Sequence, residues 1–194
     1  MTQINIHTID NPGWGVDIFS SRIKSAIRTV TFSQELSDDD WLIQIVDNHY
    51  LMTVGDSLKL SKIIELIISF YGLEVKSLQL YYQLAPLLDW ISQWYANECD
   101  GYWEHIYGVR GEIDEKGQLH LVIDLDETIW QDEDFQEESN CRMEEYKFII
   151  DCECQEIITC LTIFKEWIEG MQTRTYLTLG VINQALSLKY KLFK

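Results

Sequence analysis

The sequence has few of the residues that break or crosslink a chain, and it has no long hydrophobic run. Only two of its 194 residues are proline. The longest apolar run, near residues 63–71, is interrupted by Glu65 and Ser69 and is too short to span a bilayer. The five cysteines are odd in number and no secretory signal precedes them, which argues against a disulfide framework. We therefore expect a cytoplasmic protein that does not cross a membrane.

Basic residues are also scarce. The chain has 15 Lys and Arg against 32 Asp and Glu, a formal net charge of −17. Proteins bind nucleic acids and anionic membranes largely through basic side chains, so we expect neither partner. Hydrophobic residues make up 46% of the chain, which indicates a folded protein with its charge on the surface. Such a surface favours a basic protein partner, although it could serve solubility alone.

Known catalytic and metal-binding patterns are missing. The sequence has no Ser-His-Asp order, no phosphate-binding glycine loop and no zinc pattern. Cys152 and Cys154 lie one residue apart, but no second pair of Cys or His follows at metal-ligand spacing. Buried thiols are the better interpretation, and we expect neither a metal nor a cofactor.

Alternating apolar residues, turn residues and helical periodicity predict an α+β protein. The expected hairpins and further strands cover residues 4–18, 26–32, 41–54, 106–125 and 146–150. One helix should begin after a Ser57 cap and end at Gly72, and a second should begin at Pro86. A third is expected over residues 156–170, whereas residues 73–84 fit either a strand or a helix.

Both halves of the chain have the same order of elements, which indicates an internal repeat. An offset of 104 residues places Ile9 on Ile113 and Leu60 on Phe164. We predict two similar units, each an antiparallel sheet of hairpins packed with one or two helices. Residues 1–84 would hold a truncated first unit and a connector. Residues 85–194 would hold a second unit with a leading helix and a C-terminal tail.

The segment at residues 90–108 occurs once and holds three of the seven tryptophans. Its Asp100, Glu104 and His105 could form an acid and base pair in a small enzyme. Neighbours in a strand point to opposite faces, however, and no second His lies at useful spacing. We favour a packed turn in which Trp103 is buried, Asp100 accepts backbone hydrogen bonds, and Glu104 or His105 bonds to a neighbour. Placed at the junction, the segment could also lock the two units together.

In the same segment, Trp94 and Tyr95 precede the Cys-Asp-Gly-Tyr-Trp-Glu-His run of residues 99–105. This arrangement resembles the signature of the immunity protein 53 family, in which a Trp-Tyr helix end precedes a Cys-Asp-Gly-Asp-Trp-Glu-His segment. The family's second signature, Thr-Leu-Asp-Asn-Pro-Gly-Trp, normally follows shortly afterwards. In this chain a version of it lies at residues 8–14, and only Ile113, Asp114 and Gly117 persist at the usual place. The resemblance implies two tandem copies of the family domain.

Resemblance to this family implies a bacterial immunity protein that binds and neutralises a cognate polymorphic toxin, of the kind used in contact-dependent growth inhibition. Residues 124–145 contain ten acids and one base, Arg142, so this run is either a toxin contact or a solvated loop. The candidate toxin-binding residues are Asp124, Asp126, Glu127, Asp132, Glu133, Asp134, Glu137, Glu138, Asp100, Trp103 and Glu104.

The leading hypothesis is stoichiometric inhibition of a basic nuclease toxin, by blockage of its active site or its substrate path. Two alternatives remain open: a small enzyme using Asp100, Glu104 and His105, and a non-catalytic scaffold for another basic protein. The chain from Met171 onward has four bases and no acid, and we expect this tail to pack along the acidic surface of its own chain.

Overall fold

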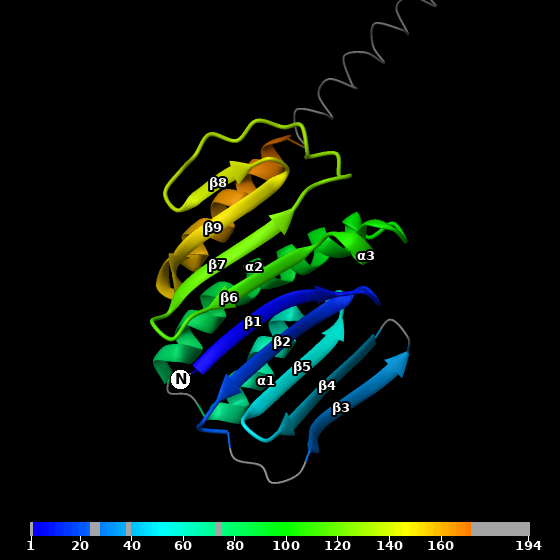
Figure 1. Ribbon diagram of the computed structural model, residues 1–194, viewed down its shortest axis with the longest axis vertical. Helices are drawn as coiled ribbons and strands as arrows, with labels where there is room; N and C mark the ends of the chain where they lie inside the picture. The colour runs from blue at the N-terminus through cyan, green and yellow to red at the C-terminus, as the bar shows by residue number, and fades with distance from the viewer. Residues whose placement is uncertain (1, 24–27, 38–39, 73–74, 172–194) are drawn as a thin grey trace, which may run out of the picture.

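The computed structural model describes residues 2–23, 28–37, 40–72 and 75–171. One antiparallel sheet runs through it in the order β3-β4-β5-β2-β1-β6-β7-β9-β8 (Figure 1). The strands are β1 (Thr2–Ile9), β2 (Gly13–Ser20), β3 (Thr29–Ser37), β4 (Asp40–Asp47), β5 (Tyr50–Asp56), β6 (Val109–Ile113), β7 (Gln118–Asp124), β8 (Cys141–Glu144) and β9 (Lys147–Glu153). The helices are α1 (Leu60–Tyr71), α2 (Val75–Glu98), α3 (Trp103–Ile106), the short η1 (Cys154–Glu156) and a helix from residue 157 to the last described residue, 171. The predicted α+β class is confirmed.

In the part of the chain that the structure describes, helices cover one face of the sheet and none lies on the other; Figure 1 is viewed from that helix-free side. Alternation along each strand decides which residues face the helices. Trp14, Val16 and Ile18 of β2 are fully buried on that side, whereas Asp17 and Phe19 face the other way. We call the helix-free side the open face. The core thus lies between the sheet and its single layer of helices.

The start of α1 differs from the prediction, while its end agrees. Lys59, not Ser57, is the N-cap residue, and no side chain caps the helix there. The Asp56 carboxylate instead accepts the Leu58 backbone N–H at 2.9 Å in the preceding turn. Gly72 ends the helix in the left-handed conformation, with φ 60°, which glycine adopts without steric cost.

Helix α2 begins eleven residues before Pro86, so the predicted helix start at this proline is wrong and residues 75–84 are helical. Proline inside a helix removes one hydrogen bond, here the one that the Tyr82 carbonyl would accept. Pro86 and Tyr82 both lie on the exposed side, where water can bond to that carbonyl. The helix runs across the predicted boundary between residues 84 and 85, and the division into two domains stays a prediction.

Several strand boundaries also differ. Strand β3 extends to Ser37, beyond the predicted residues 26–32, of which residues 26 and 27 lie outside the described ones. Strand β8 was not predicted. Ile106, predicted as the start of a strand, belongs instead to the helical turn α3, so β6 begins only at Val109. The hairpin of β4 and β5 is confirmed, with Asn48 and His49 at positive φ in a two-residue turn.

Two units with the same strand order meet edge to edge, because β1 pairs with β6. The order β1-β2-β5-β4 in the first unit matches β6-β7-β9-β8 in the second. Equivalent pairings place Ile4 on Val109, an offset of 105 residues, and Asp56 on Glu153, an offset of 97 residues. The single offset of 104 is therefore wrong: it moves the core side of β1 to the open side of β6, and it aligns β4 with β9.

With these offsets the counterpart of Ile6 is Gly111, and Ile6 pairs directly with Gly111 in the sheet. An antiparallel pair centred on two equivalent residues has a local two-fold axis through its centre. The two units are therefore arranged like the subunits of a symmetric dimer, but within one chain.

Candidate functional site

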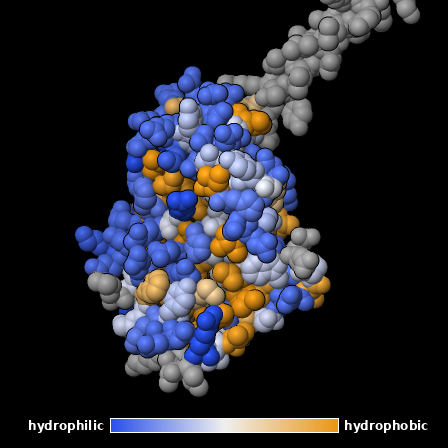
Figure 2. All heavy atoms as spheres, turned by 45° about the vertical axis from the view of Figure 1, so that its right-hand side comes forward, coloured by the Kyte–Doolittle hydropathy of each residue, from blue (hydrophilic) through white to orange (hydrophobic). Residues whose placement is uncertain are grey.

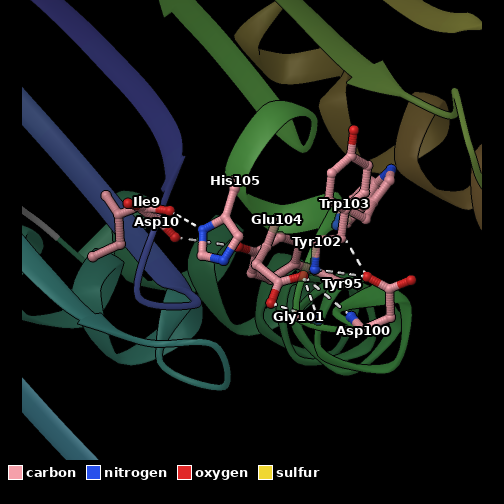
Figure 3. A network of polar contacts seen from close by, with 9 residues as sticks. All are labelled: Ile9, Asp10, Tyr95, Asp100, Gly101, Tyr102, Trp103, Glu104 and His105. Carbon is pink, nitrogen blue, oxygen red and sulfur yellow. Dashed lines mark hydrogen bonds and ion pairs between the residues drawn. The ribbon is translucent and has the colours of Figure 1, made fainter.

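The chain turns sharply after α2, and backbone hydrogen bonds to two carboxylates hold the turn (Figure 3). One oxygen of Asp100 accepts the backbone N–H groups of Tyr102 at 2.9 Å and Trp103 at 3.0 Å, which lowers the pKa of that carboxyl. Glu104 accepts the N–H of Gly101 at 2.9 Å and that of Asp100 at 3.1 Å. The predicted packed turn is confirmed, with Trp103 buried beneath it. We call residues 99–108 the corner.

The corner and the residues on either side of it also join the second unit to the first. Tyr95, at the end of α2, packs its ring edge against Trp14 with centroids 5.2 Å apart. His105 forms an ion pair with Asp10 in the turn after β1, and this contact raises the pKa of the imidazole (Figure 3). The Val109 N–H donates to the Thr8 hydroxyl at 3.1 Å. The expected role of this segment in locking the units together is thus confirmed.

As an acid and base pair, the corner is poorly arranged. Glu104 is only 7% exposed and both of its oxygens are occupied by backbone N–H groups. His105 is exposed and bound to Asp10. Asp100, Glu104 and His105 line neither the apolar cavity beneath α2 nor the hollow at the β3 and β4 end of the open face. Among the described residues, no cluster of His, Cys, Asp or Glu could hold a metal ion.

Residues 125–140, which we call the acidic loop, follow β7 and rest on the corner. Apolar side chains fix the loop: Leu125 and Trp130 are buried, and Phe135 packs on Phe148 with ring centroids 4.8 Å apart. Two tryptophans tie it down, because Trp130 donates to the Glu98 carboxylate at 2.9 Å and Trp103 donates to the Asp126 carbonyl at 3.0 Å. These contacts hold the backbone of the acidic loop in place.

Its carboxylates point outward from that backbone. The exposed acids of the loop are Glu127, Asp132, Glu133, Asp134, Glu137 and Glu138, while Asp126 and the neighbouring Asp124 are partly exposed. Within the described part of the chain, none of these eight acids forms an ion pair. The structure thus brings Asp126 into contact with the corner candidate Trp103, and spreads the others along the loop. The basic tail, apart from Met171, lies outside the described residues.

Sequence reasoning missed the partners that the first unit supplies to the corner. Thr8, Asp10 and Trp14 belong to the second signature, which marked them as a turn with a tryptophan but not as contacts of a segment about ninety residues away. Cys152 is buried, and burial raises the pKa of its thiol to about 12, as expected for an inert structural cysteine.

Fold and surface together define the class: an acidic α+β protein of two similar units. The family model described as Immunity protein 53 matches residues 1–71 and 88–169. The chain belongs to the immunity protein 53 family, and the two matched segments are consistent with a tandem duplication. Membership implies immunity against a toxin and suggests a non-enzymatic inhibitor.

Comparison with curated proteins and with solved structures gives no match to the chain. None of the helices in the described residues combines the length and apolar character needed to cross a membrane.

Proposed function

We propose that the protein neutralises its toxin by stoichiometric binding, and that the toxin is a basic nuclease whose active site or substrate path becomes covered. The observation that carries this proposal is the acidic loop, whose outward carboxylates have no ion-pair partner in the described residues. A nuclease binds a polyanion, so its substrate path is cationic. A protein surface dense in carboxylates competes with the nucleic acid for the basic side chains of that path.

Electrostatics gives this proposal two measurable consequences. Like charges along residues 124–138 repel one another, and a cationic partner relieves that repulsion. Opposite net charges also accelerate encounter, and salt screens the attraction over a Debye length of about 8–10 Å. Complex formation should therefore be fast at low salt and slow markedly as salt is added.

The test uses the protein encoded by the gene immediately upstream, in a binding assay and in cells that express it. Wild type should form a salt-sensitive one-to-one complex and protect the cells. Neutralising three loop acids should lower the association rate about 3–10-fold with a weaker salt dependence. The loop variant is D132N/E133Q/D134N, and a control with the same charge change at exposed acids elsewhere is D89N/E115Q/E166Q.

Absence of both a complex and protection would refute the proposed function. An equal loss in both triple variants would show that net charge, rather than the acidic loop, attracts the toxin.

A further inference from the structure

The open faces of the two units differ in chemistry although their strands correspond. The first unit shows an apolar patch there, made of Phe19, Val30, Ile43, Ile45, Tyr50, Met52 and Val54. Phe19 is 47% and Val30 57% exposed, and the other five are partly exposed. Figure 2 shows hydrophobic side chains gathered on the lower part of the molecule, where the first unit lies.

The second unit has polar residues at most of the equivalent positions. The counterparts of Phe19, Ile43, Ile45, Tyr50 and Val54 are Asp124, Asn140, Arg142, Lys147 and Asp151, and only Met52 has an apolar counterpart, Ile149. Arg142 pairs with Asp151 and with Glu144, and His120 lies 2.6 Å from Asp151. Polar and charged contacts therefore join several side chains on the open face of the second unit.

Comparing the open faces of the two units shows whether the fold requires apolar residues there. Both faces are built on the same strand order and the same pairing pattern. The second unit forms with charged residues at these positions, so the sheet itself does not need apolar ones. Contiguous exposed apolar side chains typically mark an interaction surface. We therefore expect a partner to cover the apolar patch.

The surroundings of the apolar patch indicate the charge of that partner. Carboxylates of Asp17, Glu35 and Asp47 border it on the open face. At one end lies a hollow of about 570 Å³ lined by Trp41 and Glu35, among others. An aromatic ring beside a carboxylate suits a lysine or arginine side chain. A partner with an apolar centre and a basic rim matches this surface.

We propose that the apolar patch on the open face of the first unit is the docking surface for the basic toxin. This inference rests on the proposed function and assigns the two units different tasks. The acidic loop of the second unit attracts the toxin at long range, and the apolar patch makes the close contact. Apolar contacts at the centre of an interface mainly set the dissociation rate.

The test transplants second-unit residues onto the first unit. In I45R/V54D, both positions take the residues of their counterparts, Arg142 and Asp151, which form an ion pair at the equivalent positions of the second unit. The dissociation constant for the upstream gene's product should rise at least ~10-fold, mostly through faster dissociation. The matched control is the reverse exchange in the second unit, R142I/D151V, which should change binding less than ~3-fold. Urea unfolding checks that each variant is folded.

A second variant covers the case in which I45R/V54D does not fold. Phe19→Asp changes one exposed side chain and adds an acid, so charge alone would strengthen binding to a basic toxin. Weaker binding by this variant therefore supports apolar contact.

The remaining outcomes separate the two proposals. If wild type binds no toxin, the proposed function fails and the docking surface with it. If wild type, Phe19→Asp and I45R/V54D all bind alike, only the docking surface is wrong. If the wild-type protein forms a dimer in sedimentation without toxin and I45R/V54D does not, the apolar patch joins two copies of this chain and the proposed occupant is wrong.

Discussion

Replacing Glu104 by alanine tests whether the corner is structural. The side chain is nearly buried and accepts the N–H groups of Asp100 and Gly101. Each N–H left without a partner costs about 1–3 kcal/mol. Asp100 and Gly101 are themselves exposed, so water can reach part of the site. The cost summed over the two N–H groups should therefore lie in the lower half of its range. We expect Glu104→Ala to lower the free energy of unfolding by about 2–4 kcal/mol in urea titrations.

Glu104→Gln retains one carbonyl oxygen and should cost about half as much. The control Glu133→Ala removes an exposed acid of the acidic loop and should change stability by less than about 0.5 kcal/mol. A loss below about 0.5 kcal/mol in Glu104→Ala would refute the structural role. A glutamine variant of full stability that no longer protects cells would instead favour a catalytic carboxylate.

Three smaller predictions test the contacts around the corner and the core. His105→Gln removes the pair with Asp10; since that pair raises the imidazole pKa, its contribution to stability is present at low pH and fades as pH rises through the raised pKa. The stability difference from wild type should therefore shrink as pH rises above the ordinary imidazole pKa of about 6.5, and a pH-independent difference would contradict this. Gly108→Ala should destabilise by about 2–4 kcal/mol in thermal unfolding, because Gly108 has φ 120° and a Cβ there would lie 2.1 Å from the Thr8 hydroxyl oxygen; a change below about 0.5 kcal/mol would show that the strand can shift. The buried thiol of Cys152 should resist alkylation in the folded protein and react only in denaturant, and fast labelling of the native chain would contradict its burial.

Local signals in the sequence predict local features well. The glycine after a helical apolar stripe marks the end of α1, and polar residues between two alternating stretches mark the hairpin of β4 and β5, whose turn is Asn48 and His49. Alternation does not say which strands pair, and the contact of β1 with β6 joins residues about 105 apart. The single offset of 104 failed because the acidic loop takes the place in the chain that β3 has in the first unit. An offset counted along the chain cannot detect this exchange.

In the corner, residue types predicted the bonds made within a few positions, such as Asp100 accepting backbone N–H groups. The pair of His105 with Asp10 was out of reach, because it depends on how the two units meet. The apolar patch was missed for a different reason. Ile43, Ile45 and Val54 alternate as strand residues should, but their neighbours Leu42, Gln44 and Thr53 take the core side, and the sequence does not distinguish the two sides of such a strand.

The local two-fold axis relates the residues on either side of an apolar groove beneath α2. The groove holds about 240 Å³, and equivalent residues line it in pairs: Leu60 with Ile157 and Ile64 with Leu161. A single helix has no two-fold symmetry, so α2 cannot pack equally well on both sides of a groove that does, and each missing contact lowers stability. The contacts of Tyr95, His105 and Val109 with the first unit hold this shared helix and both units in one register. Because contacts at the corner stabilise the fold, side chains on the open face of the first unit can be exchanged without unfolding the sheet.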